Sequence, residues 1–128
     1  MGRPRVLLAD DHAQVAEQLR SVLEGEFEVV AIVGDGQALL DSAAALCPDV
    51  IVTDVAMPVL DGISAARALR ERNPDARIVF VTVHNDPALV QQGLAAGALG
   101  YVLKLTAGDD LIPAVRAALR GERHVALG

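Results

Sequence analysis

The sequence predicts a doubly wound α/β domain, in which a five-stranded parallel sheet is covered by helices on both faces. Five short apolar runs alternate with five segments whose apolar residues recur at helical spacing, an order typical of parallel sheets. The runs are continuously apolar, which favours strands buried on both faces. Hydrophobic residues make up 52% of the 128 residues but aromatic residues only 2%, so the core is expected to consist of Val, Leu, Ile and Ala.

The first half of the chain contains three predicted strands separated by two predicted helices. Each strand is a short apolar run rich in β-branched residues, and each helix carries Leu, Val or Ala at helical spacing. Gly25 ends the first helix, and Pro48 closes the second. In chain order, the elements are strand 5–9, helix 13–24, strand 27–33, a helix that begins after Gly34-Asp35-Gly36, and strand 50–53.

The second half adds three helices and two strands. Asp61 and Gly62 supply a turn and a helix cap, and Asp86 is expected to cap a helix that has Pro87 at its first position. Asp109 or Asp110 is expected to cap the last helix, which Gly121 ends. In chain order, the elements are helix 63–72, strand 78–83, a helix from 87 through 94, strand 99–103 and the last helix.

The end of the chain is expected to lie outside the domain. Residues 122–128 are too short for another element, so we interpret them as the start of a linker or a trimmed end. The domain then comprises residues 1–121. No internal repeat or second domain is apparent in the sequence.

Charge and composition argue against several classes of protein. The net charge of −6 disfavours direct binding of nucleic acid, which requires a basic surface. Cys47 is the only cysteine, so no internal disulfide is possible, and we interpret it as a buried or loop residue. The sequence shows neither a signal-peptide pattern nor an apolar run that could span a membrane, and a cytoplasmic protein is expected.

Polar residues at the ends of four of the predicted strands define a candidate site. In an open parallel sheet, ligands bind beyond the carboxyl ends of the strands. Clustered carboxylates repel one another and persist chiefly beside a cation, and oxygen ligands favour Mg²⁺. A lysine among them would bind a phosphoryl group, which a carboxylate can accept by nucleophilic attack. The residues at the strand ends are Asp10 and Asp11, Asp54, Thr82 and Lys104.

Four motifs, in this order and spacing, resemble the receiver domain of two-component response regulators over essentially the whole chain. They are A-D-D-H at 9–12, V-T-D-V-A-M-P-V-L-D-G at 52–62, V-T-V-H at 81–84 and G-Y-V-L-K at 100–104. The resemblance implies a flavodoxin-like (βα)5 fold with strand order 2-1-3-4-5. It also implies that Asp54 accepts a phosphoryl group from a sensor histidine kinase in a Mg²⁺-dependent reaction, in which Mn²⁺ is a possible substitute.

The same resemblance implies a role for each residue of the site. Asp10 and Asp11 would organise Mg²⁺ together with Asp54, and Ala56 would add its backbone carbonyl. Lys104 would pair with the phosphoryl oxygens. Thr82 would turn its hydroxyl toward the phosphoryl group, and the rotamer of Tyr101 would follow. Ala56 and His84 border the site, and we expect them to tune the lifetime of the phosphoryl group.

The segment from G-A-L-G-Y-V-L-K to A-V-R-A-A-L-R-G-E is similar to regulators whose effector is a LuxR-type helix-turn-helix. The resemblance implies a transcriptional effector, which this chain does not contain, and contact with nucleic acid through that effector only. A homodimer on phosphorylation is possible, and no membrane partner is expected. The domain would not be an enzyme beyond catalysing its own phosphorylation and dephosphorylation.

Simpler interpretations exist for each residue taken alone. An aspartate at a turn is commonly a helix cap, and capping alone explains Asp61 and the pair Asp109-Asp110. His12 and His84 lack the spacing of a zinc site. A rival function is a small Mg²⁺-dependent phosphohydrolase with an aspartyl-phosphate intermediate, which would need a second aspartate at position 56. A third possibility is a receiver that has lost phosphorylation and only binds proteins.

Overall fold

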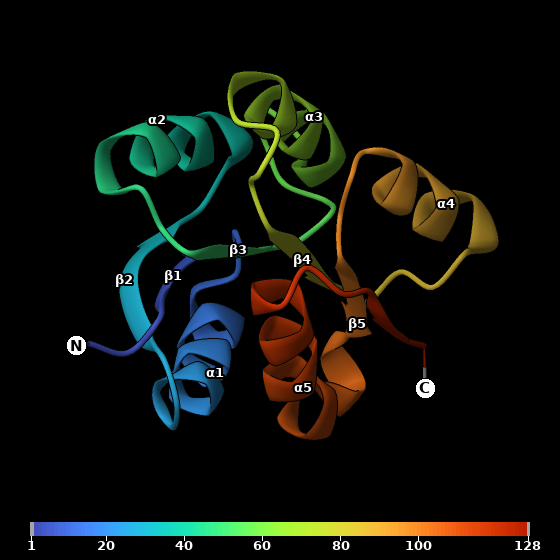
Figure 1. Cartoon of the computed structure of the whole chain (residues 1–128). Coiled ribbons are helices and arrows are strands. Elements are labelled where there is room, and N and C mark those ends of the chain that lie inside the picture. The colour runs from blue at the N-terminus through green and yellow to red at the C-terminus, as the bar shows by residue number, and fades with distance from the viewer. Residues whose placement is uncertain (1, 128) are drawn as a thin grey trace.

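A six-stranded parallel sheet lies at the centre of the protein, whose computed structural model describes residues 2–127 (Figure 1). The strand order is β2-β1-β3-β4-β5-β6, and all neighbouring strands pair in parallel. The strands are β1 (Arg5–Ala9), β2 (Glu28–Val33), β3 (Val50–Thr53), β4 (Ile78–Thr82), β5 (Gly100–Leu103) and β6 (His124–Ala126). The helices are α1 (Ala13–Glu24), α2 (Gly36–Leu46), α3 (Gly62–Arg72), α4 (Pro87–Ala95) and α5 (Ala107–Leu119).

The helices cover both faces of the sheet, as the sequence predicted. Figure 1 shows α2, α3 and α4 on one side and α1 and α5 on the other. Side chains of β3 alternate between the two cores: Ile51 packs on the side of α2 and α3, whereas Val50 and Val52 pack on the side of α1 and α5. This two-sided burial explains the continuous apolar runs. The five expected strands are present in the expected flavodoxin-like order, 2-1-3-4-5.

Helix caps fix where two of the helices begin. The Asp61 carboxylate accepts a hydrogen bond from the Ser64 amide at 2.8 Å, which confirms the predicted cap of α3, and Asp35 caps α2 in the same way. The expected cap of α5 is wrong. A short 3₁₀ turn, Lys104–Thr106, carries the chain into α5 at Ala107. Asp109 and Asp110 therefore lie in the first helical turn, where the helix dipole favours negative charge.

The prediction that residues 122–128 form no further element is also wrong, because β6 lies within them. The left-handed conformation of Gly121, with φ of +74°, lets the chain turn after α5. The His124 amide then donates to the carbonyl of Leu99 at 2.8 Å, and β6 pairs with β5. Three residues give no detectable periodicity, yet they satisfy backbone groups at the edge of β5. The domain limit at 121 and the linker stay predictions.

Two smaller expectations concern the environment of Cys47 and the presence of a membrane-spanning helix. Cys47 is exposed and adopts a left-handed conformation, with φ of 47°, directly after α2. It is therefore a loop residue and not a buried one. Within residues 2–127, none of the helices has the length and apolar character needed to cross a membrane.

Gly62 is the glycine that seats α3 against the end of β3. A Cβ atom at this position would lie only 1.9 Å from the carbonyl oxygen of Asp54, whereas a Cβ atom at Gly108 in α5 would meet nothing within 4 Å. We expect Gly62→Ala to lower the free energy of unfolding by about 2 to 3 kcal/mol, because the backbone must shift. Gly108→Ala is the matched control and should raise this free energy by up to about 1 kcal/mol. Urea unfolding measures both, and equal values for the two variants would contradict the close packing.

Candidate functional site

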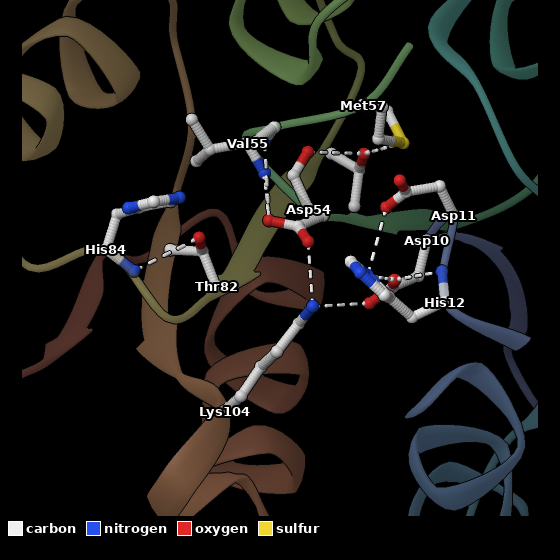
Figure 2. Close-up of polar contacts among 11 residues, drawn as sticks. Asp10, Asp11, His12, Asp54, Val55, Met57, Thr82, His84 and Lys104 are labelled. Carbon is white, nitrogen blue, oxygen red and sulfur yellow. Dashed lines mark hydrogen bonds and ion pairs between the residues drawn. The ribbon is translucent and has the colours of Figure 1, made fainter. Parts of the chain in front are cut away.

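Two buried carboxylates and one ammonium group meet at the carboxyl end of the sheet (Figure 2). Asp10 follows β1, Asp54 follows β3 and Lys104 follows β5. The Nζ atom of Lys104 lies 2.7 Å from Oδ2 of Asp54 and 2.8 Å from Oδ2 of Asp10. Asp10 and Asp54 are 3% and 4% exposed, so these charges interact in a largely water-free environment. The predicted convergence of these three residues is confirmed.

Backbone amides orient the Asp54 carboxylate. Its Oδ1 atom accepts hydrogen bonds from the amides of Val55 at 2.7 Å and Ala56 at 3.4 Å. Its Oδ2 atom accepts from Lys104. The loop is itself anchored, because the Asp54 amide donates to Ala9 and the Gly62 amide donates to the carbonyl of Val55. The two oxygens of Asp54 are therefore distinct: one faces the backbone and the other faces the lysine and the acids.

The acids beside Lys104 have the composition of a metal site. Each of Asp10, Asp11, His12 and Asp54 offers one ligand atom, and these atoms lie within 4.8 Å of one another. Oδ2 of Asp10 is buried, and the ammonium of Lys104 lies 2.8 Å from it. Carboxylates this close together repel one another unless a cation neutralises them, so the cluster fits a metal ion. His12, whose Nδ1 lies 3.2 Å from Asp11, was not expected in this cluster.

Two opposing effects, burial and the neighbouring carboxylates, set the pKa of Lys104. Burial lowers the pKa of Lys104, but its contacts with the carboxylates of Asp10 and Asp54 outweigh burial and raise the pKa above its usual value. The ammonium form is therefore favoured in the folded protein. The cluster holds three carboxylates and a single ammonium, which leaves an excess of negative charge at the site.

Thr82, His84 and Tyr101 form a second group that borders the acids. The Thr82 hydroxyl accepts from the His84 amide at 3.3 Å, and the Tyr101 hydroxyl donates to the carbonyl of His84 at 2.6 Å. Burial, followed by the charges of Asp86 and Asp54, raises the pKa of Tyr101 to about 12. The Tyr101 ring is fully buried and stands edge-on to Phe80. The backbone of His84 thus connects the two residues predicted to switch, a link with no signature in the sequence.

Gly93 lets α4 pack closely against the rings of Phe80 and Tyr101. A Cβ atom at Gly93 would lie 3.1 Å from the ring of Phe80 and 3.5 Å from the ring of Tyr101.

Ala56 and His84, the two positions expected to tune phosphoryl lifetime, line one cavity of about 350 Å³ between the loops and α3 and α4. Ala56 contacts Asp54 through its amide, and the role of its carbonyl stays a prediction.

The fold and the site together define a class of small α/β domains with an acidic pocket and a lysine at the carboxyl edge of a parallel sheet. A sequence model of the response regulator receiver domain matches residues 6–116. The chain belongs to the response regulator receiver domain family.

Individual relatives agree with this assignment. The chain is 41% identical over 120 residues to the transcriptional regulatory protein YxjL of Bacillus subtilis, with 92% of this chain and 55% of that protein covered. It is 36% identical over 123 residues to the transcriptional regulatory protein DegU of Brevibacillus brevis, covering 94% of this chain and 52% of DegU. The chain thus spans about half the length of the curated relatives it matches.

Solved structures show the same fold. A two-component response regulator of the LuxR family from Aurantimonas sp. SI85-9A1 superimposes with a TM-score of 0.91 at 33% identity, covering 97% of this chain and 89% of that chain. The isolated receiver domain of RcsB from Salmonella enterica serovar Typhimurium, in the presence of the phosphomimetic BeF3⁻, gives 0.88 at 31% identity, covering 97% and 94%. These similarities support a receiver of the LuxR-type branch.

Lys104 is the only lysine of the chain, so its side-chain NMR signals can be followed through a pH titration without ambiguity. We expect a midpoint above the usual lysine value in metal-free solution, and a lower midpoint in Asp54→Asn, because one carboxylate partner is lost. Since the folded pKa is raised, the ion pair stabilises the fold fully below about pH 10.4, and this contribution is lost as the pH rises through the folded pKa. The same midpoint in both proteins would show that Asp54 does not hold the ammonium.

Proposed function

We propose that this chain is the phosphoacceptor domain of a two-component response regulator, in which Asp54 receives a phosphoryl group from a sensor histidine kinase. The observation that carries the proposal is the Asp54 carboxylate, which is buried, oriented by two amides and paired with Lys104. One of its oxygens attacks the phosphorus atom of a phosphohistidine. The phosphorus–oxygen bond forms as the phosphorus–nitrogen bond breaks, and the electron pair of that bond stays on the imidazole nitrogen of the donor.

Asp10, Asp11 and Asp54 are the residues that would hold Mg²⁺, with the backbone carbonyl of Ala56 as a further ligand. The support is the cluster of carboxylate oxygens, which lie within 4.8 Å of one another, and the burial of Asp10 and Asp54. When bound, Mg²⁺ would neutralise the negative charge that develops on the phosphoryl oxygens. Hard oxygen donors favour Mg²⁺ and also allow Mn²⁺.

Lys104 and Thr82 would bind the oxygens of the phosphoryl group. Phosphorylation replaces a single negative charge by about two and adds strong acceptor oxygens. The Lys104 ammonium, which already contacts Asp54, would pair with one of these oxygens. The Thr82 hydroxyl would leave the His84 amide and donate to another. Tyr101 would then fill the space that the Thr82 hydroxyl vacates, and this change would alter the surface around α4 and β5.

The output of the domain is proposed to be transcriptional control through an effector domain. Two relatives are transcriptional regulatory proteins of about twice the length. Two RcsB dimers are described as bound to two parallel DNAs, in a structure with which this chain shares 31% identity. By this reasoning, the whole protein would act in the cytoplasm, would bind nucleic acid through its LuxR-type effector and would form a homodimer on phosphorylation.

A signalling domain is favoured over the phosphohydrolase alternative. The chain belongs to a family of signalling receivers, not of classical enzymes. A hydrolase with an aspartyl-phosphate intermediate would use a second aspartate as general acid two residues past the nucleophile, and position 56 is alanine. A receiver that has lost phosphorylation is also disfavoured, because the acids and Lys104 are all in place.

Phosphorylation of Asp54 can be tested with a small acyl phosphate donor and Mg²⁺, using the intact mass as readout. We expect the wild type to gain one phosphoryl group, and a chelator to abolish the gain because the negative charges are no longer neutralised. Asp54→Asn should show no gain, whereas the control variant Asp109→Asn, in α5, should match the wild type. A phosphoryl group that persists in Asp54→Asn would reject Asp54 as the acceptor.

His84 is proposed to shield the phosphoryl group from water, since small Ala56 leaves room for an attacking molecule in the shared cavity. We expect His84→Ala to speed loss of the phosphoryl group by about threefold, which corresponds to about 0.6 kcal/mol of barrier. Val83→Ala, which truncates an exposed neighbour, is the control and should leave the rate unchanged. A phosphoryl lifetime that is equal or longer in His84→Ala would remove the shielding role.

A further inference from the structure

Thr53 is a buried hydroxyl residue at the end of β3, on the side of the sheet where Ile51 packs in an apolar core. Its side chain is fully buried. Valine has nearly the same shape as threonine and would fill this position without burying a polar group. A buried hydroxyl is costly unless it is hydrogen-bonded. The bonds that Thr53 makes are therefore informative about the role of this residue.

The Thr53 hydroxyl donates to the carbonyl oxygen of Asp54 at 2.9 Å. That carbonyl belongs to the peptide group whose N–H, on Val55, donates to Oδ1 of Asp54 at 2.7 Å. A continuous chain of hydrogen bonds thus runs from the hydroxyl, through one peptide group, to the side chain of the acceptor. In such a chain each hydrogen bond strengthens the next, and the peptide plane is held at both edges.

The position of the Asp54 carbonyl makes the hydroxyl difficult to replace. Gly62 packs so closely against this oxygen that a Cβ atom would lie 1.9 Å away. Within residues 2–127, no backbone amide donates to this carbonyl. A second, weaker contact joins the Thr53 hydroxyl to Sδ of Met57 at 3.9 Å. Thr53 therefore supplies the hydrogen bond that keeps this peptide group from rotating.

We propose that Thr53 is a positioning residue for phosphoryl transfer. Its hydroxyl fixes the peptide group between Asp54 and Val55, so that the Val55 amide holds Oδ1 and Oδ2 stays turned toward Lys104 and the acids. Without the hydroxyl, the peptide group rotates to find another donor, and the carboxylate loses its single orientation. Loss of alignment slows a reaction that depends on a correctly placed nucleophile. The inference rests on the proposed function of Asp54.

Two measurements on Thr53→Val and Thr53→Ser test the proposal. The first is the Val55 amide proton, followed by NMR chemical shift and deuterium exchange in the absence of phosphoryl donor. The second is the rate of Mg²⁺-dependent phosphorylation by an acyl phosphate. We expect Thr53→Val to move the Val55 signal, to lose exchange protection there and to slow phosphorylation by about fivefold or more. Thr53→Ser keeps the donor and should remain within about twofold of the wild type.

Thr106→Val is the matched control, because the Thr106 hydroxyl is buried without a hydrogen-bond partner. It should leave both measurements at their wild-type values. If Thr53→Val does not fold, Thr53→Ala removes the same donor without adding volume and carries the test. Wild-type rate and Val55 signal in a folded Thr53→Val or Thr53→Ala overturn the positioning role alone. A wild-type protein that is not phosphorylated on Asp54 overturns the proposed function and this inference together.

Discussion

The site depends on one arrangement of charges, in which the Lys104 ammonium lies between the carboxylates of Asp10 and Asp54. Taking a charged group out of water costs several kcal/mol, and the cost is offset only when the partner charges lie at contact distance. The three residues directly follow β1, β3 and β5, so their contact requires that these strands keep their register. The parallel sheet, with its helices on both faces, is the rigid frame that meets this requirement.

The same constraint explains why the residues around Asp54 are small or hydrogen-bonded. Gly62 lets α3 begin directly against the Asp54 carbonyl, and the Thr53 hydroxyl donates to that carbonyl. The next peptide amide then holds one oxygen of the carboxylate, which leaves the other for Lys104. The contacts with Gly62, Thr53 and Val55 are local in sequence, yet together they set the direction of a side chain that must meet a residue 50 positions later. Local backbone geometry and long-range charge pairing therefore specify the same rotamer.

Much of this arrangement was predictable, because buried strands and amphipathic helices leave strong patterns. The five main strands, the Asp61 cap and the meeting of Asp10, Asp54 and Lys104 followed from residue types and spacing. Other features have no such pattern. Strand β6 is too short for a period and forms because the edge of β5 offers unpaired backbone groups. The partners of Thr53 and Tyr101 are backbone carbonyls, which every residue carries, so their hydrogen bonds are visible only in three dimensions.

The charge balance of the acids and Lys104 explains why a neutral hydroxyl is useful beside them. Three carboxylates and one ammonium leave a formal charge of about −2, which one divalent cation can neutralise. A phosphoryl group on Asp54 would add about one further negative charge, and a neutral hydroxyl donor would have to help satisfy its oxygens. Thr82, on β4, is the nearby hydroxyl, and the backbone of His84 joins it to Tyr101 on β5. Since Lys104 directly follows β5 and β5 pairs with β6, the response to phosphorylation would reach the edge strand β6.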